Sequence, residues 1–190
     1  YEIGVRLVGS EMCIRDSRMI LDSLLETYNI NSLDESEKQR LNKAWHRLDP
    51  WSDSVEGLTY LKENYIISSL SNGNVALLVN MAKYGGLPWD TVLSAELVRH
   101  YKPDREAYLS TAEFFGLPIE KVMMVAAHKN DLKSARSTGM RTAYVPRPNE
   151  HGPNVETDRE PEDYIDIIAD DFIDLSKKLS KVRETGSIPE

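Results

Sequence analysis

Three short polar segments of this sequence each follow an apolar run and precede a stretch that favours a helix. The first segment is Ser71, Asn72 and Gly73, which follow residues 65–70. The second contains Lys102, which lies just before a predicted helix. A hydroxyl, a carboxamide and backbone N–H groups ahead of a helix can bind an anionic group. A fixed ammonium beside them can neutralise a carboxylate or a developing negative charge. These segments predict a site for a small anion.

The third segment, residues 126–131, adds a carboxylate and an imidazole. Asp131 falls in the first turn of the following helix, where the helix dipole favours a negative charge. His128 precedes it by three residues and is the type of side chain that exchanges a proton near neutral pH. Each residue also has an ordinary structural interpretation as a helix cap, a turn residue, a solvated lysine or a loop histidine. Their shared placement at strand ends raises the weight of the functional interpretation.

Helices and strands alternate along most of the chain, which predicts an α/β fold. Short buried apolar runs between amphipathic helices indicate a mainly parallel sheet covered on both faces. In such a sheet ligands bind at the carboxyl ends of the strands. The predicted strands are residues 65–70, 91–94, 122–126, 142–145 and 166–169, and the predicted helices are residues 55–63, 75–84, 105–115, 132–137 and 172–182.

Residues 18–48 contain no predicted strand and form a helical pair outside the sheet. Apolar residues recur at helical spacing over residues 18–28 and again over residues 32–48. Ser32 and Glu35 match a capping box, in which each side chain satisfies a backbone donor at the start of the second helix. Asp49 and Pro50 end that helix. The pair is interpreted as part of a cap inserted into the core.

The first seventeen residues differ from the rest of the sequence. They show neither helical nor alternating periodicity, and residues 8–17 resemble a translated sequencing-adapter or cloning remnant. The alternative is an ordinary N-terminal strand over residues 5–8, which would leave Asp16 as a conceivable functional carboxylate. We expect residues 1–17 to be a non-native segment, residues 18–49 a cap remnant, residues 50–184 the core and residues 185–190 a flexible tail.

Composition excludes several classes of partner. The chain has 31 acidic and 23 basic residues and a net charge of −8, without a basic cluster that could bind nucleic acid. Its longest apolar run, residues 122–127, is much shorter than a membrane span. A single cysteine, Cys13, cannot form an internal disulfide, and no secretory pattern opens the chain. A cytoplasmic protein is expected.

The strand-end segments together resemble the conserved sites of the haloacid dehalogenase superfamily, and more closely those of its 2-haloacid dehalogenase branch. The resemblance covers residues 18–182 and is strongest after Pro50. It implies a three-layer α/β/α Rossmann-like core with a helical cap after the first strand, and residues 18–48 match the end of that cap. The matching stretches are LSNGN at residues 70–74, RHYKP at residues 99–103 and MVAAHKNDLKSARSTGMRTAYVPRP at residues 124–148.

The same resemblance implies a reaction and a role for each residue. An Asp on the first strand would attack the carbon that bears the halogen, and water would hydrolyse the resulting ester. Ser71, Asn72 and Asn130 would hold the nucleophile and the substrate carboxylate. Lys102 would neutralise the carboxylates, and Asp131 would orient Lys102 and the water.

The first-strand Asp and the cap arginine of this family have no counterpart in the sequence. No apolar run that ends in Asp and a Gly-Thr turn precedes the cap. We therefore expect these 190 residues to be inactive by themselves, and we expect the gene to encode an active hydrolase of small 2-haloacids.

One departure from the family pattern leaves alternatives open. Many dehalogenases of this branch have Ser-Ser-Asn where this chain has Ala126, Ala127 and His128, so His128 is predicted to activate the water. A magnesium-dependent phosphatase of the same superfamily would need a second carboxylate where Ala127 stands. We therefore favour dehalogenation without a metal or other cofactor. A non-catalytic fragment that binds small acids is the other alternative, and a homodimer stays open.

Overall fold

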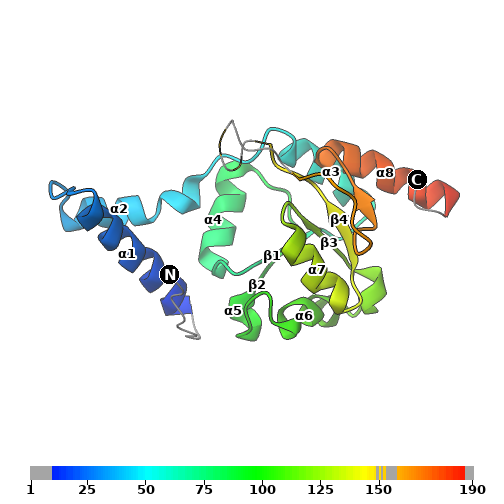
Figure 1. Cartoon of the computed structure of the whole chain (residues 1–190), viewed down its shortest axis with the longest axis horizontal. Helices are drawn as coiled ribbons and strands as arrows, with labels where there is room; N and C mark the ends of the chain where they lie inside the picture. Colours follow the sequence, from blue (N-terminus) through cyan, green and yellow to red (C-terminus); the bar gives the residue numbers. More distant parts are fainter. Residues whose placement is uncertain (1–9, 149, 151, 153–157, 187–190) are drawn as a thin grey trace.

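The computed structural model describes residues 10–148, 150, 152 and 158–186, with side chains from residue 17 onward. Helices and strands alternate through the core, as the sequence predicts (Figure 1). None of the helices in this part of the chain is long and apolar enough to cross a membrane. The elements are α1 (Ser10–Thr27), α2 (Glu35–Asn42), the 3-10 helix η1 (Ala44–Arg47), α3 (Ser54–Lys62), β1 (Ser68–Ser71), α4 (Val75–Gly85), β2 (Thr91–Ser94), α5 (Ala95–Val98), α6 (Arg105–Phe115), the 3-10 helix η2 (Ile119–Lys121), β3 (Met123–Ala126), α7 (Lys129–Ser137), β4 (Arg141–Tyr144), β5 (Ile167–Ile168) and α8 (Phe172–Thr185).

The described strands form two separate parallel sheets instead of one. β1 pairs with β2, with Ser71 opposite Ser94 at the last position. β4 lies between β3 and β5 in the second sheet, with Ala126 opposite Tyr144. All pairs are parallel, so the carboxyl ends within each sheet lie at one edge. The described residues place no ladder between β1 and β3.

The second sheet has a helical layer on each face, which confirms the three-layer arrangement. Successive strand residues point to opposite faces. Met123 and Val125 of β3 therefore border one apolar cluster, formed with α3 and α8. Met124 and Ala126 face the other cluster, to which α6 and α7 contribute.

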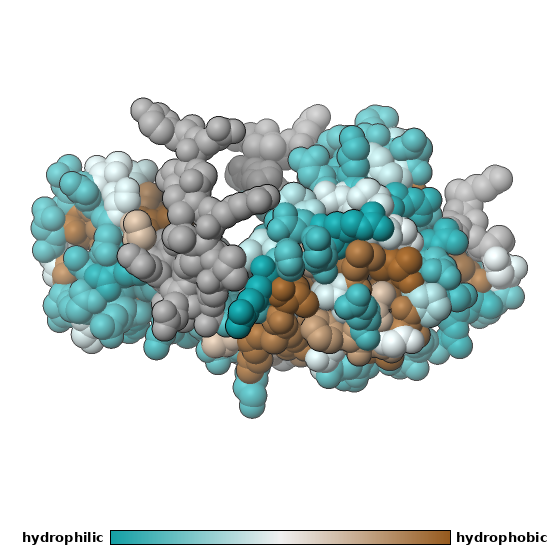
Figure 2. Space-filling view, turned by 90° about the horizontal axis from the view of Figure 1, so that it is seen from below, coloured by the Kyte–Doolittle hydropathy of each residue, from teal (hydrophilic) through white to brown (hydrophobic). Residues whose placement is uncertain are grey.

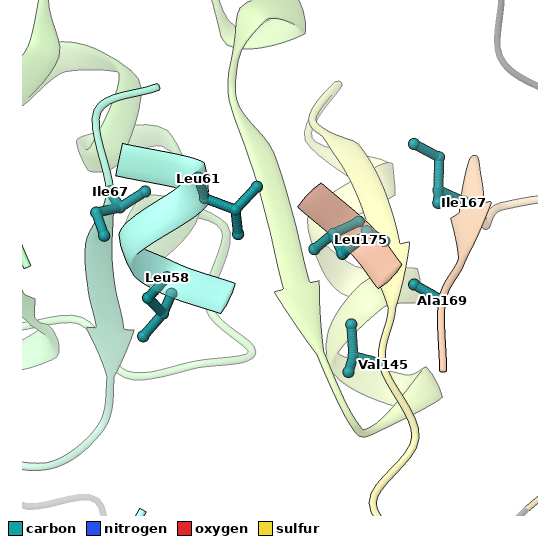
Figure 3. Packing of buried hydrophobic residues seen from close by; sticks show 8 residues of the cluster. Leu58, Leu61, Ile67, Val145, Ile167, Ala169 and Leu175 are labelled. Atoms are coloured by element: carbon teal, nitrogen blue, oxygen red, sulfur yellow. The ribbon is translucent and has the colours of Figure 1, made fainter. Parts of the chain in front are cut away.

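The α3–α8 layer joins the two sheets. Leu58 and Leu61 of α3 share one cluster with Ile67 next to β1, and with Val145 and Leu175 on the side of β4 and α8. Figure 3 shows α3, with Leu58 and Leu61, between β1 and β3; Ile67 lies on the β1 side and Val145 and Leu175 on the other. The two sheets are thus held together by packing.

A close approach of two helices explains the glycine within α3. A Cβ at Gly57 would lie 2.4 Å from the Cβ of Phe172 and 2.8 Å from the backbone nitrogen of Ile173. No side chain larger than hydrogen fits there without moving the α8 backbone.

The helices α1, α2 and η1 lie at one end of the molecule, apart from both sheets (Figure 1). α1 packs on α2, and η1 packs on α4. The predicted capping box is displaced by two residues. Asp34 accepts a hydrogen bond from the backbone of Glu37, whose carboxylate accepts one from the backbone of Asp34. Both patterns occur in the sequence, and the second starts the helix.

Figure 2 shows exposed apolar surface in small patches at this end and in a larger area on the core. Ile20 and Leu24 on α1 and Tyr28 just after its end are all exposed. The sequence favours core packing for Trp45, Trp51 and Trp89. This prediction is wrong for two of them, because Trp45 is 61% exposed and Trp51 is 45% exposed. Trp89 does pack against the core.

Several element boundaries differ from the predicted ones. α1 begins at Ser10, so its backbone helix extends into the segment that the sequence suggests is foreign. α7 begins three residues before the prediction, and the predicted helix over residues 32–48 is divided into α2 and η1. The interpretation of residues 1–9 lies outside the described residues.

Candidate active site

The predicted site residues lie at or just beyond the carboxyl ends of strands. Ser71 is the last residue of β1, and Asp131 is in the first turn of α7 after β3. Lys102 follows β2 and the short helix α5. The structure brings Lys102 and Asp131 into direct contact, although 29 residues separate them.

Lys102, Asp131 and Tyr108 form a compact polar cluster. The Nζ atom of Lys102 lies 2.5 Å from Oδ2 of Asp131, and both side chains are 18% exposed. The hydroxyl of Tyr108 donates to Oδ1 of Asp131 at 2.7 Å. Both carboxylate oxygens thus have a donor, which excludes the interpretation of Asp131 as a simple helix cap. Hydrogen bonds to a charged group of this kind are stronger than neutral ones.

Tyr108 is the site residue that the sequence interpretation missed. Its side chain is fully buried on α6. Burial and the hydrogen bond to Asp131 raise the pKa of Tyr108 well above its ordinary value, so the phenol stays protonated and donates. The sequence holds a signal that could have identified Tyr108 as a site residue. Tyr108 lies near the start of α6, only six residues after Lys102. A tyrosine on a buried helix face needs a polar partner for its hydroxyl.

The loop between β1 and α4 is fixed by its own polar side chains. Oγ of Ser71 accepts a hydrogen bond from the backbone of Gly73 at 3.0 Å. Asn74, and not Ser71, caps α4 by accepting from Leu77. Ser94, at the end of β2, donates to the carbonyl oxygen of Gly73 at 2.6 Å.

This loop leaves fewer free amides for an anion than its sequence suggests. Oε2 of Glu96 accepts from the backbone of Val75, the first residue of α4. Together with the Asn74 cap, this contact provides protein acceptors for two N–H groups at the helix start. Ser71 retains a hydroxyl proton that it can donate.

Asn72, His128 and Asn130 are each placed differently. The carboxamide of Asn72 contacts the backbone of Lys102 through both its nitrogen and its oxygen. His128 precedes α7 with its side chain 61% exposed, and its Nε2 lies 2.9 Å from Oε1 of Glu150. Asn130 is exposed in the first turn of α7. The roles predicted for these three residues remain predictions.

Comparison with known proteins identifies the family. Residues 6–139 match the model of the haloacid dehalogenase-like hydrolases. The chain belongs to this family. The matched region begins inside residues 1–17, and the interpretation of that segment as foreign stays a prediction.

Solved structures of similar proteins confirm the fold of this haloacid dehalogenase-like chain. An L-2-haloacid dehalogenase is 44% identical, with a TM-score of 0.81, and the alignment covers 85% of this chain and 71% of that one. A defluorinating L-2-haloacid dehalogenase is 46% identical, with a TM-score of 0.82, over 86% of this chain and 68% of that one.

Curated relatives also carry the 2-haloacid dehalogenase name. The (S)-2-haloacid dehalogenase 4A of Burkholderia cepacia is 32% identical over 65% of this chain and 54% of its own length. The (S)-2-haloacid dehalogenase of Pseudomonas fluorescens is 28% identical over 62% of this chain and 53% of its own length. This family member spans about half the length of the curated relatives it matches.

The strand-end cluster of this haloacid dehalogenase-like chain has no second carboxylate at the position of Ala127. Within the described residues, no group of three or more His, Cys, Asp or Glu side chains is arranged to hold a metal ion. Reaction without a metal remains a prediction from the sequence.

Proposed function

We propose that this protein hydrolyses the carbon–halogen bond of small 2-haloacids and releases 2-hydroxy acids. The observation that carries this proposal is the cluster of Lys102, Asp131 and Tyr108 at strand ends, in a chain of the haloacid dehalogenase family. Lys102 offers a positive charge that the substrate carboxylate and an attacking carboxylate both require. The names of the relatives support the substrate class.

The proposed reaction has two steps. A carboxylate oxygen attacks the carbon that bears the halogen, and the halide leaves with the bonding electron pair. Water then attacks the carbonyl carbon of the resulting ester. The carboxylate is regenerated, the 2-hydroxy acid departs, and one proton passes to a base. His128 is proposed as that base.

The nucleophile is proposed to stand on a strand between β1 and β3. Both flanking strands are parallel to their own partners, and the described residues leave one edge of each without a ladder partner. A parallel strand between them would end close to Ser71 on one side and the start of α7 on the other. It would also satisfy the edge N–H and C=O groups of β1 and β3.

Halide release tests the proposal. Resequencing genomic DNA upstream of the codon for Arg18, and expressing the protein with whatever strand is found, should give release from 2-chloropropionate. In that protein Lys102→Ala should reduce the rate by at least about 100-fold, because a charge made for the transition state is lost. Arg159→Ala is the matched control, because Arg159 forms an exposed ion pair with Asp170. We expect the 190-residue chain itself to release no halide.

Isotope labelling separates the proposed ester route from direct attack by water. In a single turnover in H₂¹⁸O with excess enzyme, the 2-hydroxy acid should carry no ¹⁸O, because its new oxygen comes from the enzyme carboxylate. Label in the first product would refute the ester. Hydrolysis of p-nitrophenyl phosphate with Mg²⁺, without halide release, would favour the phosphatase alternative.

A further inference from the structure

The carboxamide of Asn72 pairs with the backbone of a single distant residue. Its Nδ2 donates to the carbonyl oxygen of Lys102 at 3.0 Å, and its Oδ1 accepts from the N–H of Lys102 at 2.7 Å. The last ladder pair of the first sheet joins Ser71 to Ser94. Beyond the end of this ladder, the carboxamide of Asn72 therefore takes the place of a backbone amide and pairs with the N–H and C=O of Lys102.

Among the described residues, the backbone of Lys102 has no partner within a helix or strand, because the residue lies between two helices. It follows α5 and precedes α6, in a segment that belongs to neither a helix nor a strand. Its backbone N–H and C=O are both paired with Asn72. The same residue extends its ammonium to 2.5 Å from Asp131. A shift of this backbone would move the ammonium relative to the carboxylate.

The loop that carries Asn72 is itself held in place by hydrogen bonds. On its carboxyl side Gly73 is held through its N–H by Ser71 and through its carbonyl by Ser94. The helix that follows is capped by Asn74. The loop that carries the carboxamide is thus joined to both strands of the first sheet.

We propose that Asn72 is a positioning residue for Lys102. Its carboxamide fixes the position of the Lys102 backbone. The lysine ammonium is thereby held at a fixed position beside the carboxylate of Asp131. The catalytic part of this inference rests on the proposed role of Lys102 in dehalogenation. Displacement of a catalytic group by about 1 Å can cost on the order of 100-fold in rate.

Amide hydrogen exchange tests the positioning role in the 190-residue chain, without any need for activity. Asn72→Ala removes the acceptor of the Lys102 N–H, so that amide should exchange about 5- to 10-fold faster. Asn72→Asp keeps an acceptor oxygen and should restore most of the protection. Asn80→Ala is the matched control, because that asparagine on α4 contacts His46 instead. Unchanged exchange of amides in α8 shows that each variant is folded.

Unchanged Lys102 exchange in folded Asn72→Ala overturns the inference, whatever the protein hydrolyses. In a halide-releasing form of the protein, the positioning role predicts a lower kcat with little change in KM. A raised KM with normal kcat would mark Asn72 as a substrate ligand and would also overturn the inference. If no form releases halide, the proposed function fails while the exchange result still decides the contact.

Discussion

Removal of the Arg147 side chain is expected to destabilise the fold strongly. Nη1 of Arg147 lies 2.7 Å from Oδ1 of Asp53, and both side chains are only 10% exposed. The guanidinium also lies against the rings of Trp51 and Phe172, 5.5 and 4.9 Å from their centroids. The pair joins the start of α3 to the segment after β4. The other oxygen of Asp53 accepts from the backbone of Phe172 at the start of α8.

The size of the effect follows from burial. Loss of one partner of a buried ion pair costs about 3–5 kcal/mol, because the other charge stays in a poorly solvated place. For a chain of this size each kcal/mol lowers Tm by about 2–4 °C, so Arg147→Ala should lower Tm by about 6–20 °C. Asp53→Ala should cost at least as much, since it also leaves the Phe172 N–H without its acceptor. The double variant should cost less than the sum of the two.

Urea unfolding followed by circular dichroism measures these free energies. Arg159→Ala is the control, because its ion pair with Asp170 is 49% and 73% exposed and should contribute less than about 1 kcal/mol. If Arg147→Ala costs no more free energy of unfolding than this control, the buried pair does not stabilise the fold in the way that its burial implies.

Three further changes test other contacts of the fold. Gly57→Ala should cost more than the roughly 1 kcal/mol that alanine adds to a helix, because its Cβ would meet the backbone of α8, and urea unfolding checks this. Tyr108→Phe should cost about 1.5–3 kcal/mol in the same assay, since Asp131 loses a buried donor; no loss would show that the bond contributes nothing. Burial acts to raise the pKa of Asp53, but hydrogen bonds from Arg147 and the Phe172 N–H outweigh it and lower the pKa. Its stabilisation should therefore be complete above about pH 4 and disappear as the pH falls through the lowered pKa, so that wild type and Asp53→Asn converge in acid urea titrations.

Local patterns predicted most of the core correctly. The strands predicted over residues 65–70 and 122–126 are found as β1 (Ser68–Ser71) and β3 (Met123–Ala126), with bounds that differ from the prediction by at most three residues. The strand-end residues could be predicted for the same reason, because a parallel sheet places the carboxyl ends of its strands at one edge.

Contacts between distant residues could not be predicted in the same way. The sequence offers capping boxes at Ser32 and at Asp34; the structure has the second, and the carboxylate of Glu35 that the first would need is paired with Arg18 of α1. Tyr108 is hidden within the buried face of its helix, and the hydrogen bond to Asp131 spans 23 residues. For Trp45 the sequence led to the opposite error, the prediction of burial for an exposed residue. Trp45 lies on a predicted amphipathic helix, but few elements cover it in the structure.

The arrangement of the two sheets explains why these long-range contacts matter for the site. Ser71 belongs to the first sheet, whereas Asp131 follows a strand of the second. In the described residues no ladder joins the sheets, so their relative position depends on the α3–α8 layer and on side-chain contacts. Lys102 contacts residues at the edges of both sheets. Its backbone pairs with Asn72 beside the first sheet, and its ammonium pairs with Asp131 beside the second. The geometry of the proposed site should therefore be sensitive to any change that lets the two sheets move apart.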